Sequence, residues 1–189
     1  MAVLVVGGGG RESGKSAVAC ALIAALPELQ WAAIKVSPHS HGLADGVWEE
    51  QDRGSEKDTG RYLRAGARRA FLMRSTDDAT ESVKQVRALA AECDAVLVES
   101  NRVRAESVAK PGEAVYSIAV LSGESSKASL QKMAGNLDAL VLANLSDPAS
   151  WVDLAAERVF VLGAGQWVTA DLVHTIRTRF LSSTASSWI

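Results

Sequence analysis

Eight residues near the start of the chain have the types and the spacing that hold a polyphosphate. They fit the pattern G-x-x-x-x-G-K-[ST] at every position and read Gly9, Gly10, Arg11, Glu12, Ser13, Gly14, Lys15 and Ser16. Glycines let the backbone turn tightly, so that successive N–H groups face inward and form an anion cradle with the start of the next helix. Lys15 adds a positive charge for the β- and γ-phosphates, and the Ser16 hydroxyl can ligate Mg²⁺. The segment therefore predicts a P-loop for a nucleoside triphosphate.

The context of this loop supports the same interpretation, because an apolar strand pattern precedes it and a helical pattern follows it. We expect the nucleotide to contact every residue from Gly9 to Ser16 and also Ala17, and we expect Lys15 to act catalytically. Arg11 either assists phosphoryl transfer or is simply exposed. No arginine finger or positioned glutamine stands out in the sequence, so we expect any hydrolysis to be slow.

A carboxylate stands at the end of another apolar run. Ala95 to Val98 is the clearest interior strand, with Asp94 before it and Glu99 after it. P-loop enzymes use an acidic residue at the C-terminal tip of a strand to face Mg²⁺, and open α/β sheets bind ligands at that edge. Glu99 is therefore the candidate Mg²⁺ ligand, with a solvated strand end as the alternative. Asp94 lies at the opposite edge and only begins the strand.

Two aspartates follow the second predicted strand and lie close to this metal site in chain order. Asp52 and Asp58 could each order a metal-bound water, and we take Asp52 as the additional metal candidate. Asp58 could equally cap the helix that follows it. His39 and His41 precede both, but two histidines alone do not make a metal site. We interpret these histidines as loop residues that are exposed or touch a substrate.

The elements that position these residues alternate along the chain. We predict strands at Val3–Val6, Trp31–Val36, Ala70–Met73, Ala95–Val98, Tyr116–Leu121, Leu140–Ala143 and Val159–Leu162. We predict helices at Lys15–Leu26, Lys57–Ala67, Asp77–Glu92, Ser126–Ala134, Ser150–Glu157 and Ala170–Leu181. The remaining long segments are a polar loop and a loose tail, at Ser37–Glu56 and Ser182–Ile189. This alternation implies a doubly wound α/β fold with a mainly parallel sheet, the three-layer α/β/α arrangement of P-loop NTPases, in one domain over residues 1–189.

The composition is typical of a globular protein. The chain has 189 residues, of which 48% are hydrophobic and 22% are charged, and its formal net charge is -2. This balance argues against a nucleic-acid partner held by bulk electrostatics. The apolar N-terminal run has no basic leader and is too short to span a bilayer, and Cys20 and Cys93 fit reduced thiols. We therefore expect a cytoplasmic protein that binds neither nucleic acid nor membrane.

With these motifs placed, the first half of the chain resembles the MobB family of P-loop GTP-binding proteins. Three features carry the likeness. The first is the loop Gly9 to Ser16, and the second is the strand that ends Leu97-Val98-Glu99. The third is the segment Lys57-Asp58-Thr59, which is followed by Arg61 and Ala65-Gly66-Ala67 and preceded by Asp52. The family has Gly after that glutamate where this chain has Ser100-Asn101. The family usually also has Lys-His at the start of the loop after its second strand, with a pair of histidines soon after. This chain keeps a lysine and two histidines there but at shifted positions, Lys35, His39 and His41.

The resemblance implies a function in cofactor assembly. MobB-like proteins assist the synthesis of the molybdopterin guanine dinucleotide cofactor. It implies binding of GTP with Mg²⁺, a molybdenum-cofactor nucleotidyltransferase as partner, and a homodimer. ATP is the alternative nucleotide.

A wider group of similar folds includes dethiobiotin synthetase, which supplies an enzymatic alternative. In that enzyme a lysine after the second strand binds substrate and the phosphoryl group, and a strand-end glutamate binds Mg²⁺. Lys35 and Glu99 match these two positions. The resemblance thus also implies an ATP-dependent small-molecule ligase or kinase in which Lys35 is catalytic.

One segment near the middle of the second half of the chain is a candidate for base recognition. Asn144-Leu145-Ser146-Asp147 has the spacing of the guanine-reading Asn-Lys-x-Asp motif but lacks its lysine. Asn144 therefore either contacts the base or ends a strand before a turn. The tryptophans are scattered along the chain, at Trp31, Trp48, Trp151, Trp167 and Trp188. They fit core or interface positions better than a platform for the base, except for Trp48 in the long polar loop.

Overall fold

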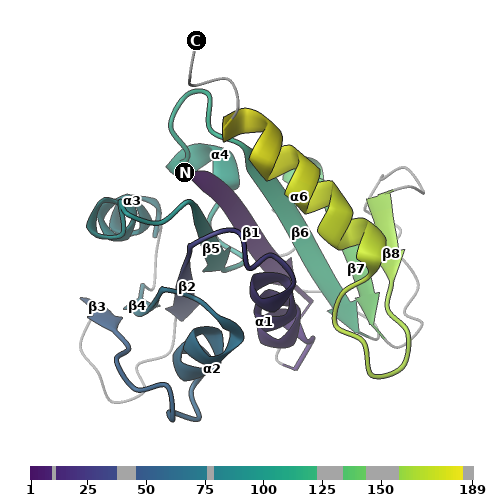
Figure 1. Ribbon diagram of the computed structural model, residues 1–189, viewed down its shortest axis with the longest axis horizontal. Helices are drawn as coiled ribbons and strands as arrows, with labels where there is room; N and C mark the ends of the chain where they lie inside the picture. The colour runs from purple at the N-terminus through teal and green to yellow at the C-terminus, as the bar shows by residue number, and fades with distance from the viewer. Residues whose placement is uncertain (10–11, 38–45, 76–78, 123–133, 144–157, 185–189) are drawn as a thin grey trace.

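The computed structural model describes residues 1–9, 12–37, 46–75, 79–122, 134–143 and 158–184. Within them, one sheet of eight strands runs in the order β3-β4-β2-β5-β1-β6-β7-β8 (Figure 1). The strands are β1 (Ala2–Gly8), β2 (Trp31–Ser37), β3 (Gly46–Glu49), β4 (Arg69–Arg74), β5 (Ala95–Glu99), β6 (Val115–Ser122), β7 (Ala139–Ala143) and β8 (Val159–Val161). The interior position of β1 places the glycine-rich loop in the middle of a sheet edge.

Among the described strands, every pairing is parallel except that of β3 with β4. The C-terminal ends of the parallel strands therefore meet at one edge, where open α/β sheets bind ligands. The register sets Val6 of β1 and Lys35 of β2 on either side of Glu99 of β5. Strand pairing alone thus brings the predicted carboxylate between the P-loop strand and the predicted catalytic lysine.

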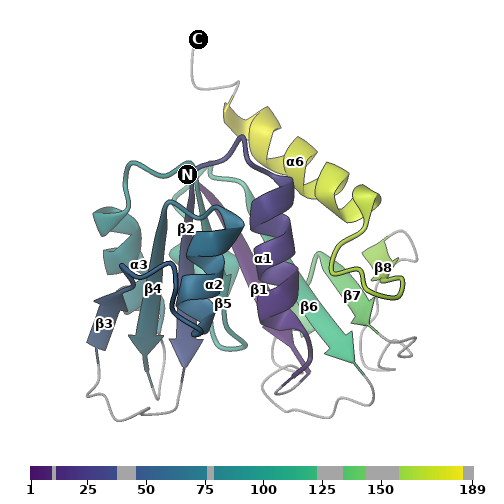
Figure 2. The ribbon, with the colours of Figure 1, turned by 60° about the horizontal axis from the view of Figure 1, so that its bottom comes forward.

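Helices cover both faces of this sheet and give the molecule three layers (Figure 2). They are α1 (Lys15–Ala25), α2 (Asp58–Ala65), α3 (Thr80–Leu89), α4 (Ala105–Val108) and α6 (Ala170–Thr184), with a 3₁₀ turn at Ala134–Asn136. Helices α1, α2 and α6 pack on one face of the sheet, and α3 and α4 pack on the other. The predicted doubly wound α/β architecture, with a mainly parallel sheet between two helical layers, is confirmed.

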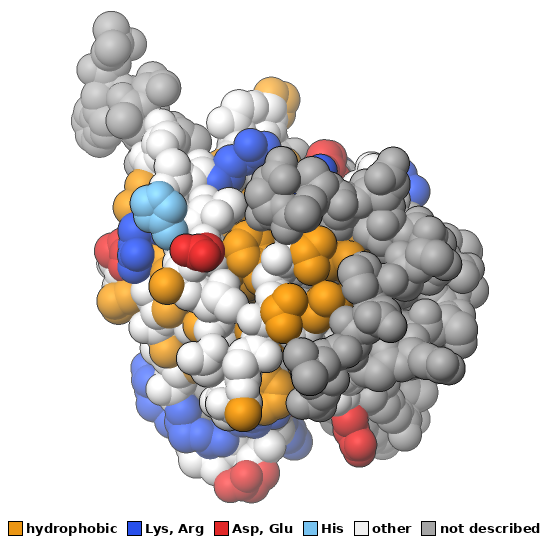
Figure 3. Space-filling model, turned by 90° about the vertical axis from the view of Figure 1, so that its right-hand side faces the viewer, with side chains coloured by type: hydrophobic (Ala, Val, Ile, Leu, Met, Phe, Trp, Pro, Cys, Tyr) orange, Lys and Arg blue, Asp and Glu red, His pale blue; other side chains and the backbone are white. Residues whose placement is uncertain are grey.

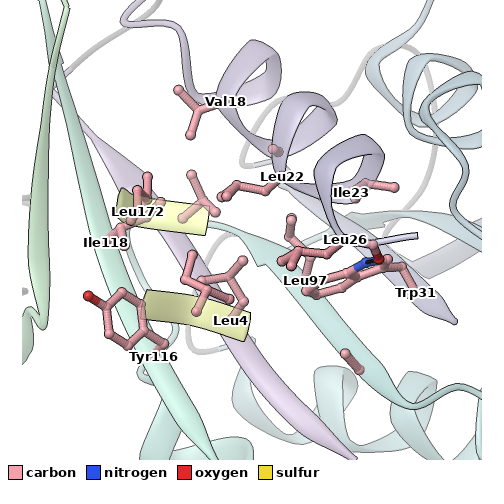
Figure 4. Close-up of a cluster of buried hydrophobic side chains, with 14 of the residues drawn as sticks. Leu4, Val18, Leu22, Ile23, Leu26, Trp31, Leu97, Tyr116, Ile118 and Leu172 are labelled. Atoms are coloured by element: carbon pink, nitrogen blue, oxygen red, sulfur yellow. Dashed lines mark hydrogen bonds between the residues drawn. The ribbon is translucent and has the colours of Figure 1, made fainter. Parts of the chain in front are cut away.

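The larger hydrophobic core lies between α1 and the sheet (Figure 4). Leu4, Leu22 and Leu97 are fully buried there, and burial of such a side chain contributes about 1.5–3 kcal/mol. The buried indole of Trp31 donates its N–H to the carbonyl of Leu26 at 3.2 Å, which satisfies its polar atom. This packing fixes the axis of α1, so that its first turn stays at the C-terminal tip of β1.

All seven predicted strands are present, each with ends within two residues of the predicted ones. The unbroken loop predicted for Ser37–Glu56 is wrong, because β3 forms inside it and pairs antiparallel with β4. The outer edge of β4 has backbone N–H and C=O groups with which the four residues of β3 pair. So short a strand has too few residues to show the alternation of apolar and polar side chains that predicts a strand. Helix α6 extends to Thr184, three residues beyond its predicted end.

Some predictions fall on residues that the structure does not describe. The helix predicted at Ser150–Glu157 is one of them, as are nearly all of the helix at Ser126–Ala134 and the last five residues of the tail. Among the helices of the described residues, none combines the length and the apolar character needed to cross a membrane.

Candidate nucleotide-binding site

The loop between β1 and α1 has an unusual backbone. Glu12 has a φ of 61° and Gly14 a φ of 87°, both in the left-handed region. Residues other than glycine rarely adopt this conformation, and such strained positions gather at functional sites. Turns that mix left- and right-handed residues direct successive N–H groups into one concavity, which binds anions. The first turn of α1 adds amides that have no carbonyl partner within the helix.

Close packing explains why Gly8 has no side chain. A Cβ on Gly8 would lie 2.6 Å from Cγ of Lys15 and 2.7 Å from Oγ of Ser13, so the loop folds directly back over this glycine. The lysine stem therefore crosses the end of β1, and its Nζ donates a hydrogen bond to Ser13 Oγ at 2.9 Å. The ammonium group is thus held beside Ser13 of the loop.

Ser16 and Glu99 meet in space although they are far apart in the chain. Ser16 Oγ donates a hydrogen bond to Glu99 Oε2 at 2.8 Å. Glu99 ends β5 and only 2% of its side chain is exposed, while Ser16 lies in the first turn of α1. The hydroxyl and the carboxylate that we predict as magnesium ligands therefore lie in direct contact.

Lys35 places its ammonium group inside a cluster of oxygen atoms. Its Nζ forms ion pairs with Glu99 Oε1 and with Asp58 Oδ2, the latter at 2.9 Å, and donates to Ser16 Oγ at 3.3 Å. Burial alone would lower the pKa of Lys35, but the carboxylates of Glu99 and Asp58 outweigh it and raise the pKa above its usual value. For Asp58, burial acts to raise the pKa, but the hydrogen bond and charge of Lys35, together with Ser16 and Arg61, outweigh it and lower the pKa below its usual value. The cluster thus carries two carboxylates and one permanent cation.

Tyr62 is a member of this cluster that the sequence analysis does not identify. Its side chain is fully buried on α2, and its hydroxyl donates a hydrogen bond to Glu99 Oε2. Burial, and next the charge of Glu99, raises the pKa of Tyr62 well above its usual value. The neutral hydroxyl therefore remains a donor and orients the carboxylate. No motif marks this tyrosine, because only the packing of α2 on the sheet brings it to the strand end.

Asn101 joins the end of β5 to the P-loop. Its Oδ1 accepts the N–H of Gly8 at 2.7 Å, and its Nδ2 donates to the carbonyl of Gly8 at 2.8 Å. The side-chain amide thereby continues the strand pairing of β1 and β5 beyond the last backbone bond, from Ser100 N–H to the carbonyl of Val6. The sequence signal for this contact is the Ser100-Asn101 pair, where MobB-like chains have glycine.

Asp52 lies outside the cluster. It is exposed, and its Oδ1 accepts the N–H of Gly54 at 2.7 Å in a local turn. The aspartate beside the lysine is Asp58, which also pairs with Arg61 NH1 at 3.1 Å. Asp58 is the first residue of α2, whose N-cap is Lys57. The geometry therefore favours Asp58 over Asp52 as the additional carboxylate of the candidate metal site.

The remaining sequence-predicted residues divide into two groups. Gly9 donates its N–H to the carbonyl of Val120 at 3.0 Å, which ties the loop to β6, and Ala17 lies in the first turn of α1. Five candidates lie outside the described residues: Gly10, Arg11, His39, His41 and Asn144.

The oxygen cluster fits a magnesium ion. The ammonium of Lys35 already satisfies a hydroxyl and two carboxylates at once, and oxygen atoms of these kinds are the ligands that Mg²⁺ takes. Within the described part of the chain, no group of three or more His, Cys, Asp and Glu side chains forms a metal site. A cation here would therefore be held by these few side chains together with the oxygens of a ligand, as is usual when Mg²⁺ accompanies phosphates.

Solved structures of P-loop NTPases share this fold. A MobB protein homologue from Bacillus stearothermophilus matches with a TM-score of 0.55 and 19% identity, over 96% of this chain and 99% of its own. HypB from Helicobacter pylori in complex with nickel matches with a TM-score of 0.57 and 12% identity, over 100% of this chain and 89% of its own. A LAO/AO transport system kinase matches with a TM-score of 0.54 and 19% identity, and 99% of this chain covers 61% of it.

No protein-family model matches the sequence, and no curated protein matches it either. At these low identities the structural likeness establishes the fold alone. The chain therefore has the P-loop NTPase fold, and what it binds has to be argued from its own residues.

Proposed function

We propose that this protein binds a nucleoside triphosphate with Mg²⁺ at the loop between β1 and α1 and hydrolyses it slowly. One observation carries the proposal. The hydroxyl of Ser16 and the buried carboxylate of Glu99 are hydrogen-bonded to each other at 2.8 Å beside a loop with the P-loop sequence. A hydroxyl at the start of a helix and an acid at a strand tip are the two magnesium-holding groups of P-loop NTPases.

The phosphates would lie in the concavity formed by the loop and the first turn of α1. Backbone amides and the helix dipole attract their negative charge there. Lys15 would exchange its hydrogen bond with Ser13 for the β- and γ-phosphates. The left-handed conformations of Glu12 and Gly14 support such a concavity, because turns of this kind direct backbone amides to one side.

Ser16 and Glu99 would hold the magnesium ion, with Asp58 as the further carboxylate of the cluster. The ion would neutralise charge that develops on the transferred phosphoryl group. Lys35 occupies this oxygen cluster in the present structure, so its ammonium group would move toward the phosphates when the ion enters. Tyr62 would keep its hydrogen bond to Glu99 and hold the carboxylate in orientation.

GTP is the first candidate nucleotide and ATP the second. The preference for GTP comes from the resemblance of the loop, the Lys57–Ala67 segment and the end of β5 to the MobB family. The same resemblance suggests an accessory protein that serves a molybdenum-cofactor nucleotidyltransferase and forms a homodimer. The character of its N-terminal run and its cysteines favours a cytoplasmic location. Slow hydrolysis is expected because no side chain in the sequence stands out as an arginine finger or as a glutamine that positions water.

Calorimetric titration of GTP and of ATP, each with Mg²⁺ and with EDTA, tests this proposal. We expect both the binding and its dependence on Mg²⁺ to be clear, with GTP bound more tightly. Turnover without a partner should be slow and should rise when the nucleotidyltransferase is added. Absence of nucleotide binding would overturn the proposal, and tighter binding of ATP would remove GTP from it.

The position of Lys35 favours a second candidate, an ATP-dependent small-molecule ligase or kinase of the dethiobiotin-synthetase type. Its ammonium group contacts Ser16 and Glu99, the two proposed magnesium ligands, beside which a γ-phosphate would be transferred. A lysine there can hold the acceptor and the migrating phosphoryl group together. Turnover that requires a carboxylic-acid or amine acceptor and disappears in Lys35→Ala would favour this candidate. Equal turnover in wild type and variant would remove it.

A further inference from the structure

The segment between β8 and α6 lies against the P-loop. Cζ3 of Trp167 is 2.9 Å from the position that a Cβ on Gly14 would occupy, so the indole ring rests directly on this glycine. Trp167 is nevertheless 45% exposed, whereas Trp31 is fully buried in the core. Figure 3 views the side of the molecule with β8 and α6, where hydrophobic side chains lie open near its centre. A large aromatic ring is thus presented to solvent at the edge of the anion cradle.

The two flanks of the loop differ in chemistry. On the β5 and β2 flank, Glu99 and Lys35 form the charged cluster around Ser16. On the β6 flank, Trp167 and Val120 are the described side chains nearest to Gly14 apart from its neighbours in the chain, and Cγ1 of Val120 is 3.8 Å from the same Cβ position. A triphosphate whose terminal end is held with Mg²⁺ at the charged flank must extend its nucleoside away from it. The apolar flank with its exposed ring lies in that direction.

The ring is held by an ordered turn. The N–H of Leu162 donates to the carbonyl of Leu142 at 2.9 Å, which extends the pairing of β8 with β7. After it, Gln166 N–H donates to the carbonyl of Gly163 at 3.1 Å, and Thr169 Oγ1 accepts the N–H of Leu172 at 3.2 Å as α6 begins. Trp167 lies between these fixed points. A ring whose position is set before binding costs little conformational entropy when a ligand stacks on it.

We infer that Trp167 binds the nucleobase by stacking, which makes the turn between β8 and α6 the base-binding wall of the site. This inference rests on the proposed function, since it needs a nucleotide in the P-loop. Stacking uses the π-face that every base has, so the ring accepts both purines and does not itself choose between GTP and ATP. It supplies affinity, and the selection of the base is left to polar groups.

The test compares ligands with and without a base in matched variants. GTP, ATP and inorganic tripolyphosphate, each with Mg²⁺, are titrated into wild type, Trp167→Ala, Trp167→Phe and Trp167→Leu. We expect Trp167→Ala to weaken binding of both nucleotides roughly 5- to 100-fold and to leave tripolyphosphate binding unchanged. Trp167→Phe should retain most of the affinity, and Trp167→Leu, which keeps an apolar cover over Gly14, should not.

Controls separate this inference from the proposed function. Trp48→Ala removes a half-buried tryptophan at the opposite edge of the sheet and should change no affinity. Nucleotide binding to Trp167→Ala at wild-type strength would overturn the stacking role, as would equal losses for nucleotide and tripolyphosphate, or Trp167→Leu binding as well as Trp167→Phe. If wild type bound neither nucleotide nor tripolyphosphate, the proposed function itself would fail and the inference with it.

Discussion

Ser16 Oγ donates a hydrogen bond to Glu99 Oε2 at 2.8 Å across a separation of 83 residues. The serine lies in the first turn of α1 and the glutamate ends β5, so this bond joins the two elements that meet at the C-terminal edge of the sheet. The carboxylate is also held by Tyr62 and Lys35. Contacts within the fold therefore bring together the two oxygen ligands that we propose for magnesium.

Glu99→Gln tests the proposed metal ligand. The amide keeps the size of the side chain and an oxygen for the hydroxyl of Tyr62, but it removes the negative charge that would bind Mg²⁺. We expect the gain in nucleotide affinity on adding Mg²⁺ to fall about ten-fold or more, with little change in the affinity measured in EDTA. Titrations of each variant in the two buffers measure the difference. The exposed Glu106→Gln is the control. An unchanged magnesium effect in Glu99→Gln would exclude this carboxylate from the metal site.

Lys35→Met tests the competition between the ammonium group and the metal. Without its cation, the buried carboxylate of Glu99 is left uncompensated, and we expect a loss of about 3–5 kcal/mol in the free energy of unfolding in EDTA. Mg²⁺ should restore part of this loss, since it can take the place of the ammonium among the oxygens. Chemical denaturation with and without Mg²⁺ measures both effects. Lys84→Met on α3, whose lysine is 47% exposed, should show neither. The same denaturation curve with and without Mg²⁺ in Lys35→Met would contradict the shared site.

Asn101→Ala tests the link between β5 and the loop. The variant leaves the N–H and carbonyl of Gly8 without their side-chain partners, which costs about 1–3 kcal/mol for partly buried groups. We expect both a lower free energy of unfolding and weaker binding of nucleotide and tripolyphosphate alike, because the anion cradle itself loosens. Asn136→Ala, on the exposed 3₁₀ turn, is the matched control. Wild-type affinity in Asn101→Ala would show that the amide supports the fold and not the site.

Tyr116 gives a prediction on pH. Burial, and next the charge of Asp138, raises the pKa of Tyr116 to about 12, above the value near 10 of an unfolded tyrosine. The unfolded chain therefore loses this proton first, so the tyrosine stabilises the fold below about pH 10 and this contribution is lost as the pH rises toward 12. Between those pH values the wild type should lose about 2 kcal/mol more than Tyr116→Phe. Denaturation curves at several alkaline pH values measure this, and parallel losses in the two proteins would contradict it.

Much of the fold follows from local sequence pattern. Runs such as Ala95–Val98 are apolar on both faces, which is typical of interior parallel strands, and their alternation with helical segments implies a layered fold. β3 could not be found in this way, because a four-residue edge strand forms in response to the open edge of β4. Tertiary pairing decides that element, and local propensity does not.

The residues of the candidate site also divide into those that the local sequence indicates and those that only tertiary packing brings together. The P-loop residues and Glu99 are recognisable because the chemistry of phosphate and Mg²⁺ fixes their types and spacing. Tyr62 and Trp167 are not recognisable in this way, since the packing of a distant element brings Tyr62 to Glu99 and Trp167 to Gly14. Asp52 and Asp58 differ by six positions in the sequence, and only the start of α2 decides which of them faces Lys35.

The most direct test of the central claim is a titration of GTP and ATP with Mg²⁺ into wild type and Lys15→Met. Methionine keeps an unbranched stem to pack over Gly8 and removes only the ammonium group. The account predicts saturable one-site binding by the wild type and an affinity about 10- to 100-fold lower in the variant, the loss of a charge-assisted hydrogen bond to phosphate. Equal affinities in the two proteins, or no binding to the wild type, would contradict it.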